Sequence, residues 1–208
     1  MWTMSTPRPA RKPRGRYHHG SLRRALIDEA LRTIQRAGVE AVTLRAVGSA
    51  LGVSRTALYR HFADKDALLA VVAREGFVAL KAALDRARAT TPSLRDQLTA
   101  MGAAYVGFAI DNPAHYQVMF GRFLERCRDE PELLADAAAA FQALVDMIVD
   151  LQQAKQVRRG DPAELSRFVW ASVHGIAMLA INGQLGPDPA AGLALYDRSA
   201  PLVRAGLQ

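Results

Sequence analysis

The sequence predicts an all-α protein of about nine helices. Apolar residues recur every three or four positions along most of the chain, which is the period of an amphipathic helix. Prolines and glycines separate these periodic stretches, and no alternating pattern long enough for a useful strand occurs. Half of the 208 residues are apolar, so the chain is expected to bury a substantial core.

The first helix is expected over residues 21–37, and three N-cap residues mark the helices that follow it. Its apolar stripe consists of Leu22, Leu26, Ala30 and Ile34. The side-chain oxygens of Thr43, Ser54 and Asp64 are suited to accept hydrogen bonds from the first N–H groups of a helix. The helices that they predict span 44–51, 55–61 and 65–89. Gly52 allows a tight turn between the two short helices through a positive φ angle.

Five more helices are expected in the rest of the chain. They lie near residues 93–111, 113–121, 131–156, 162–183 and 189–206. Proline is well tolerated in the first turn of a helix, because the N–H that it lacks would have no partner there. Four of these helices accordingly start at prolines, namely Pro113, Pro131, Pro162 and Pro189.

The two short helices have the features of a helix-turn-helix. Helices of this length are not stable alone and must pack against each other. The residues expected to supply the apolar contacts are Ala46, Val47, Ala50, Leu51, Val53, Leu58 and Phe62. Ala50 is expected to be the small residue at the point of closest approach. The alternative interpretation is a compact helical bundle with no role in DNA binding.

The positive charge of the chain is concentrated in its first third. Residues 1–75 carry 14 Lys and Arg against 6 Asp and Glu, whereas residues 76–208 carry 13 against 14. Residues 1–16 are expected to form a flexible basic arm. A basic domain joined to a neutral one indicates a nucleic-acid partner for the basic part. The alternative is a solvated basic face that keeps the protein soluble.

The second short helix has a polar free face, and in a helix-turn-helix this helix enters the major groove. Arg55 can donate two hydrogen bonds to guanine, and the methyl groups of Thr56 and Ala57 can contact a thymine methyl. The other members of the surface are expected to contact the DNA backbone or, for the arm, the minor groove. The expected DNA-binding residues are Arg14, Arg16, Thr43, Ser54, Arg55, Thr56, Ala57, Tyr59, Arg60, His61 and Lys65.

Residues 44–69 resemble the DNA-binding signature of the TetR family of bacterial repressors, and the similarity covers about residues 17–70. The positions that match the family's characteristic residues include Tyr59, His61, Phe62 and Lys65. The resemblance implies three DNA-binding helices followed by a larger domain that dimerises and binds a ligand. The expected division is an arm (1–16), a DNA-binding domain (17–65) and a ligand-binding and dimerisation domain (66–208). Residues 112–121 and 169–175 also resemble a TetR subgroup with a Trp…His-Gly motif.

Aromatic and methionine side chains predict a ligand pocket in the second domain. Trp170, His174 and Met178 are spaced by four residues and share one helix face. The expected pocket residues are Tyr105, Phe108, His115, Met119, Phe120, Phe123, Trp170, His174 and Met178. Such a pocket suits a small, partly apolar ligand, and the alternative is an ordinary aromatic core.

The helix over 162–183 is apolar around most of its circumference, which predicts burial on both sides. Together with the last helix it is expected to form a four-helix interface between two subunits. The expected interface residues are Leu165, Phe168, Ser172, Val173, Ile176, Ala180, Leu195, Tyr196 and Leu202.

These features predict a transcriptional regulator, namely a repressor that a small, partly apolar ligand releases from a palindromic operator. The helix over 65–89 is expected to be the one element that joins the two domains and transmits the effect of the ligand. The alternative is a DNA-binding protein without a small-molecule effector, which is either constitutive or redox-responsive. In the redox-responsive case Cys127, which is flanked by two arginines, would be the sensor.

An RNA-binding or architectural DNA protein and an enzyme on a helical scaffold are further alternatives. No histidine lies in a metal-binding motif, and neither a Gly-rich phosphate loop nor a nucleophile elbow occurs. No metal, cofactor or catalytic residue is therefore expected. No apolar run approaches the ~20 residues of a transmembrane helix, and no secretory signal is visible. With a single cysteine, these features predict a cytoplasmic protein with no membrane partner.

Overall fold

The computed structural model describes residues 19–126 and 130–208, and every regular element within these ranges is a helix. The all-α fold class is therefore confirmed. The α-helices are α1 (His19–Ala37), α2 (Leu44–Ala50), α3 (Arg55–Tyr59), α4 (Lys65–Thr90), α5 (Leu94–Asp111), α6 (Pro113–Met119), α7 (Pro131–Gln153), α8 (Pro162–Ile181) and α9 (Ala190–Ala205). Two 3₁₀ helices that the sequence did not predict are η1 (Val39–Ala41) and η2 (Arg122–Arg126). The predicted basic arm and Cys127 lie outside the described residues.

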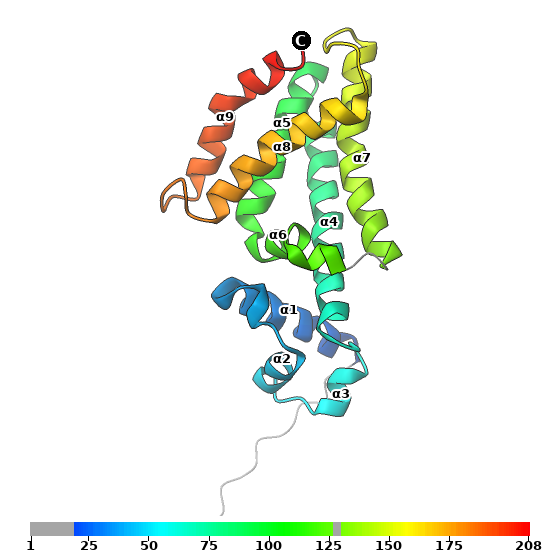
Figure 1. The fold of residues 1–208 in the computed structure, drawn as a ribbon, viewed down its shortest axis with the longest axis vertical. Coiled ribbons are helices and arrows are strands. Elements are labelled where there is room, and N and C mark those ends of the chain that lie inside the picture. The colour runs from blue at the N-terminus through cyan, green and yellow to red at the C-terminus, as the bar shows by residue number, and fades with distance from the viewer. Residues whose placement is uncertain (1–18, 127–129) are drawn as a thin grey trace, which may run out of the picture.

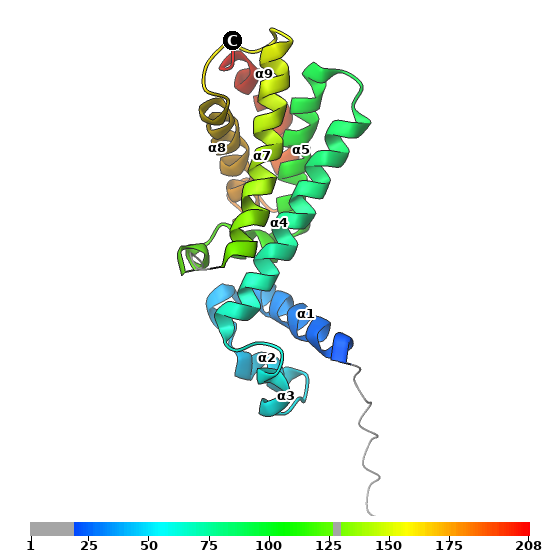
Figure 2. The same ribbon diagram turned by 90° about the vertical axis from the view of Figure 1, so that its right-hand side faces the viewer.

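The helices form a small unit at one end of the molecule and a larger bundle at the other (Figure 1). The small unit consists of α1, α2 and α3. From there α4 runs along the bundle, where it packs against α5 and α7, while α8 packs on α5 and α7 and α9 lies against α5 and α8 (Figures 1 and 2). No helix in the described part of the chain combines the length and the apolar character needed to cross a membrane.

Two elements, rather than the single helix that was predicted, connect the small unit to the bundle. Both α4 and α6 contact α1, and α6 also contacts η1. The two connecting helices approach closely at Gly76 of α4, where a Cβ atom would lie 2.4 Å from Sδ of Met119 on α6. Short helices such as α6 can bridge two units because each of their faces is available for a different neighbour.

The three predicted N-caps are confirmed. Thr43 Oγ1 accepts a hydrogen bond from the N–H of Ala46 at 3.0 Å, Ser54 Oγ from that of Ala57 at 3.3 Å, and Asp64 Oδ1 from that of Ala67 at 2.7 Å. Each bond satisfies a backbone donor that has no partner within its own helix. Gly52 has a φ angle of 65°, as the turn between α2 and α3 requires.

The contact between α2 and α3 differs from the prediction in one respect. Ala46 and Ala50 are exposed, and the closest approach is at Gly48, where a Cβ atom would lie 3.2 Å from Cδ1 of Leu58. The buried face of α2 contains Leu44, Val47 and Gly48. The two alanines lie more than about 100° away from the centre of that face around the helix, so they cannot contact α3.

Most predicted helix boundaries agree with the structure to within two residues, but α7 ends at Gln153 rather than at residue 156. Lys155 has a φ angle of 56°. A residue with this left-handed conformation cannot continue a right-handed helix.

Candidate functional site

The exposed side of α3 is the candidate DNA-binding surface. The residues exposed there are Ser54, Arg55, Thr56, Tyr59 and Arg60, whereas Ala57 and His61 are half-buried. Cζ of Arg55 lies 5.5 Å from the centroid of the Tyr59 ring, so a cation–π interaction supports the guanidinium. Because stacking uses the face of the guanidinium, the N–H groups on its edge remain available as donors. Arg14 and Arg16 lie outside the described residues.

The capping hydroxyl groups of Thr43 and Ser54 are also placed at this surface, and both residues are exposed. In each of them the hydroxyl oxygen accepts the capping hydrogen bond. A hydroxyl group that accepts in this way still has its own proton to donate. Capping is therefore compatible with the predicted contact to a phosphate oxygen.

Lys65 at the start of α4 has partners within the chain. Its Nζ donates to the carbonyl oxygens of Val39 and Glu40, at 3.0 and 3.5 Å, and lies 3.8 Å from the Glu40 carboxylate. In the free chain this ammonium group therefore fixes η1 to the start of α4. Its contact with phosphate stays a prediction.

The sequence did not single out Arg45, which is exposed in the first turn of α2 next to Thr43. A basic side chain at this place in the first helix of a helix-turn-helix was the available signal. Its position makes Arg45 a candidate for contact with the DNA backbone.

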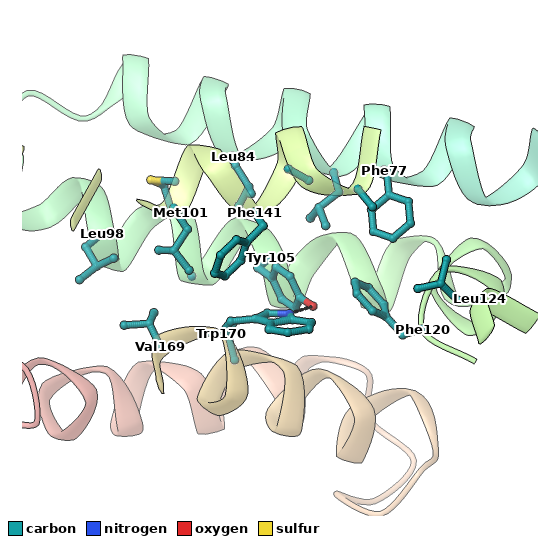
Figure 3. Close-up of a pocket in the computed structure, with 16 residues that line it drawn as sticks. Phe77, Leu84, Leu98, Met101, Tyr105, Phe120, Leu124, Phe141, Val169 and Trp170 are labelled. Atoms are coloured by element: carbon teal, nitrogen blue, oxygen red, sulfur yellow. Dashed lines mark hydrogen bonds between the residues drawn. The ribbon is translucent and has the colours of Figure 1, made fainter. Parts of the chain in front are cut away.

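A cavity of about 190 Å³ lies within the larger bundle, between α4, α5, α7 and α8. The residues that line it are Phe77, Leu80, Leu84, Leu98, Met101, Gly102, Tyr105, Phe120, Leu124, Ala137, Ala140, Phe141, Leu144, Val169, Trp170 and Val173. Leu98 and Leu124 lie at opposite ends of this group (Figure 3). Tyr105 and Trp170 supply the only polar side-chain atoms of the lining, so the cavity suits an apolar ligand.

The structure brings three of the nine predicted pocket residues to this cavity, namely Tyr105, Phe120 and Trp170. The six that do not line it are Phe108, His115, Met119, Phe123, His174 and Met178. Phe108 instead lines a surface hollow with Ala79 and Ala83 of α4. Met119 is fully buried. Spacing by three or four residues identifies side chains on one helix face, but it does not say which faces of different helices meet.

None of the residues that α7 contributes to the cavity wall was predicted from the sequence. It consists of Ala137, Ala140, Phe141 and Leu144. Phe141 is the one aromatic residue of α7, and this was the available signal. Three of the four residues are small or aliphatic and are equally typical of a helix packed in an ordinary core.

Beside the cavity, four polar side chains bond to one another. Trp170 Nε1 donates to the hydroxyl of Tyr105 at 3.0 Å. The Tyr116 hydroxyl lies 2.9 Å from the Tyr105 hydroxyl and 2.7 Å from Nδ1 of His174, which is also 3.2 Å from the Tyr105 hydroxyl. The Phe120 ring packs on the rings of Trp170 and His174, so the cluster supports one side of the cavity.

The proton count of this cluster favours a neutral His174. With the imidazole proton on Nε2, one tyrosine hydroxyl donates to the other and the second donates to Nδ1, which satisfies both. A proton on Nδ1 would leave one hydroxyl proton without an acceptor in the cluster. Burial also lowers the pKa of His174, and it raises the pKa of Tyr105 to about 12 and that of Tyr116 above its ordinary value. The cluster is therefore uncharged near neutral pH, so the side of the cavity that it supports offers a ligand apolar contact rather than charge.

The predicted interface residues fall into two groups. Leu165, Val173, Ile176 and Tyr196 are buried within the chain itself, so they have little surface left for a second subunit. Phe168 and Leu202 are exposed, while Ser172, Ala180 and Leu195 are half-buried. Leu179, which was not predicted, is a further exposed apolar side chain of α8.

Comparison with known proteins identifies both parts of the chain. A family model described as "Bacterial regulatory proteins, tetR family" matches residues 26–72, and one described as "Tetracyclin repressor-like, C-terminal domain" matches residues 98–200. The chain is 28% identical to the HTH-type transcriptional repressor Rv1474c of Mycobacterium tuberculosis over 189 residues, which cover 88% of this chain and 94% of that protein.

The similarity to solved structures of the same fold covers nearly the whole chain. A protein of unknown function from Rhodococcus sp. RHA1 is 31% identical, with a TM-score of 0.80, over 93% of this chain and 99% of its own. The transcriptional regulator FadR of Bacillus subtilis, solved in complex with stearoyl-CoA, has a TM-score of 0.73 at 14% identity, over 89% of this chain and 99% of its own. The two family matches, on the helix-turn-helix and on the helical bundle that contains the cavity, show that the chain belongs to the TetR family of DNA-binding transcriptional regulators.

Proposed function

We propose that this protein is a homodimeric repressor that leaves a palindromic operator when a small apolar ligand fills the cavity. The observation that carries the proposal is that one helix, α4, both begins beside the candidate reading helix α3 and supplies Phe77, Leu80 and Leu84 to the cavity wall. The proposed DNA-binding domain (17–65) and ligand-binding and dimerisation domain (66–208) meet at the start of this helix. Such a regulator would act in the cytoplasm, where its operator is.

A second connection runs through α6. Phe120, which lines the cavity, directly follows the last residue of α6. Met119 of the same helix lies against Gly76 of α4. A ligand that displaces Phe120 would therefore move α6 against both α4 and α1, and the change would reach the DNA-binding unit by two routes.

A two-fold dimer requires an apolar surface outside the cavity, and α8 with α9 offers one. Phe168, Ser172, Gly175 and Leu179 follow each other at helical spacing on α8. Apart from its chain neighbours and the backbone of α8 itself, no described atom lies within 4 Å of the place where a Cβ of Gly175 would be. Leu202 of α9 is 73% exposed. In such a dimer the two α3 helices would enter successive major grooves, about 34 Å apart.

The relatives agree with this function in two respects. Rv1474c is named a repressor, and B. subtilis FadR, a transcriptional regulator of the same fold, was solved in complex with stearoyl-CoA, a ligand with an aliphatic chain. The cavity in this chain has a volume of about 190 Å³. A cavity of about 150 Å³ holds a benzene ring, so 190 Å³ corresponds to about eight carbon atoms. Membership of the Trp…His-Gly subgroup stays a prediction.

The test uses 1-octanol as an apolar probe and a DNA duplex selected by the protein from a random pool. In a Trp2→Phe background, Trp170 is the one tryptophan left, and its fluorescence reports filling of the cavity. Octanol is expected to change this fluorescence and to weaken DNA binding over the same concentration range. A 100-fold weakening corresponds to a coupling free energy of about 2.7 kcal/mol.

Two alanines of α7 provide a matched pair of variants. Ala140→Phe fills the cavity and is expected to abolish both effects of octanol while DNA binding without octanol persists. Ala138→Phe, at an exposed position of the same helix, is expected to leave both effects intact. If octanol changed the fluorescence of Trp170 without releasing DNA, the cavity would not be the regulatory site.

A further inference from the structure

The apolar cavity adjoins a polar groove at the end of the bundle remote from α3. The groove has a volume of about 390 Å³, and its lining residues are Arg95, Leu98, Leu151, Lys155, Gln156, Val157, Arg204, Leu207 and Gln208. Leu98 lines both the cavity and the groove. Its side chain, at one end of the cavity in Figure 3, is therefore the partition between the two spaces.

Two walls of the cavity continue to a basic residue in the groove. On α5, Arg95 lies three residues before Leu98 and shares its helix face. On the α7 side, Leu144 lines the cavity, Leu151 lines the groove, and Lys155 follows just beyond the end of the helix. The apolar lining thus ends in a positive charge on two separate elements.

Two of the three cationic side chains of the groove, Arg95 and Lys155, carry charge that no carboxylate partner among the described residues offsets. Arg204 of α9 lies 4.0 Å from Asp96, but in the described part of the chain neither Arg95 nor Lys155 forms an ion pair. Residues 76–208 carry one more acidic than basic residue, so this basic site results from the folding of three distant segments. Cations that converge beside one end of an apolar cavity attract an anionic group.

We propose that the ligand is an amphiphilic anion. Its aliphatic chain, of about eight carbons, lies in the cavity, and its carboxylate or phosphate-bearing head lies in the groove beside Arg95, Lys155 and Arg204. A change in the side-chain rotamer of Leu98 opens the path between them. This inference rests on the proposed function, because it names the class of ligand for the same cavity.

The test compares octanoate with 1-octanol, which have chains of equal length and differ in charge. Binding is measured by the fluorescence of Trp170 in the Trp2→Phe protein. Octanoate is expected to bind about tenfold more tightly, because each partly exposed charge contact contributes a factor of about two to five. This preference is expected to shrink as salt is added, since salt screens exposed charges.

Two double variants locate the head group. Arg95→Gln with Lys155→Gln is expected to reduce octanoate binding to the level of octanol and to leave octanol binding unchanged. Arg158→Gln with Arg159→Gln removes two charges from the adjacent loop, outside the groove lining, and is expected to keep the preference. Octanoyl-CoA distinguishes the two kinds of head, because tighter binding than octanoate assigns the groove to a phosphate-bearing group and weaker binding assigns it to a carboxylate.

Three outcomes would overturn the inference. Equal binding of octanol and octanoate to the unsubstituted groove would show that the head group is not recognised, while the apolar cavity of the proposed function would stand. A preference that survives Arg95→Gln with Lys155→Gln would place the anion elsewhere. If neither probe changed the fluorescence of Trp170, the inference and the proposed function would fail together.

Discussion

The guanidinium of Arg24 on α1 lies 2.8 Å from the carboxylate of Glu75 on α4. The pair joins the small unit of α1, α2 and α3 to α4, which lines the cavity. The neighbouring residue on α4, Arg74, pairs with Asp136 on α7 at 2.9 Å and with Glu132. One turn of α4 is thus tied to a helix of each unit, which makes this turn a point through which strain can pass between them.

The Arg24–Glu75 pair is expected to contribute little to stability. The Arg24 side chain is 48% exposed and the Glu75 side chain 34% exposed. Exposed ion pairs contribute about 0.2–1 kcal/mol. A double-mutant cycle of Arg24→Gln and Glu75→Gln, measured by urea unfolding, should give a coupling energy of about 0.5 kcal/mol that vanishes in about 1 M salt. A coupling energy unaffected by salt would show that the contact is not electrostatic.

Arg55 is predicted to read a base and Arg45 to contact the backbone. Arg55→Ala should weaken binding to a selected duplex by ~1–3 kcal/mol and relax specificity at one base pair. Arg45→Ala should weaken binding to all sequences alike and reduce the salt slope by about one unit. Binding assays on selected and random duplexes at several salt concentrations separate the two. Equal losses on both duplexes for Arg55→Ala would contradict base reading.

Two glycines of α5 should respond to alanine in opposite ways. A Cβ at Gly102 would lie 2.1 Å from the hydroxyl oxygen of Tyr196, which donates a hydrogen bond to the carbonyl of Thr99 at 2.9 Å. Gly102→Ala should therefore cost about 1–3 kcal/mol in the free energy of unfolding. At Gly107 no described atom outside the local backbone of α5 lies within 4 Å of the same position, so Gly107→Ala should stabilise the protein by roughly 0.5–1 kcal/mol through helix propensity. Urea unfolding measures both, and two changes of the same sign would be inconsistent with this packing.

Because of His174, the free energy of unfolding is predicted to decrease as the pH is lowered below about 6.5. Burial lowers its pKa in the folded chain, whereas the unfolded chain has the ordinary pKa of about 6.5, so the unfolded state takes up the proton first. The stabilisation is fully present above about pH 6.5 and is lost as the pH falls towards the folded pKa. His115, whose pKa burial also lowers, acts in the same direction.

Urea unfolding at about pH 7.5 and pH 5.5 measures this dependence on either side of the ordinary histidine pKa. His174→Gln removes the titrating group. The free energy of unfolding of this variant should therefore fall less between about pH 7.5 and pH 5.5 than that of the unsubstituted protein. An identical loss in both proteins would show that His174 does not contribute.

The exposed apolar surface of α8 and α9 is predicted to hold the dimer together. Phe168→Glu with Leu202→Glu should give a monomer in sedimentation experiments, because two charges would have to be buried without partners. Binding to a palindromic duplex should fall accordingly. Leu134→Glu, at an exposed apolar position of α7, is the control and should remain a dimer. A dimeric Phe168/Leu202 variant would place the interface on another face.

The sequence by itself determined the α-helices, their caps and the exposed face of α3. Thr43, Ser54 and Asp64 begin helices where they were expected to, because a cap bonds to an N–H group three residues away and needs no distant partner. The exposed side of α3 follows for a similar reason. In a helix of five residues, the burial of Leu58 leaves Thr56, about 160° away around the helix, on the solvent side.

Only the tertiary structure decided how the faces of distant helices meet. A helix such as α8 has apolar residues on most sides, and its spacing alone does not show that Trp170 turns to the cavity, that His174 turns to Tyr116, or that Phe168 stays exposed. The same holds for Arg95 and Lys155, which converge only when α5 and the end of α7 pack together. Local periodicity depends on neighbours within four residues, whereas a cavity depends on side-chain volumes contributed by helices far apart in the chain.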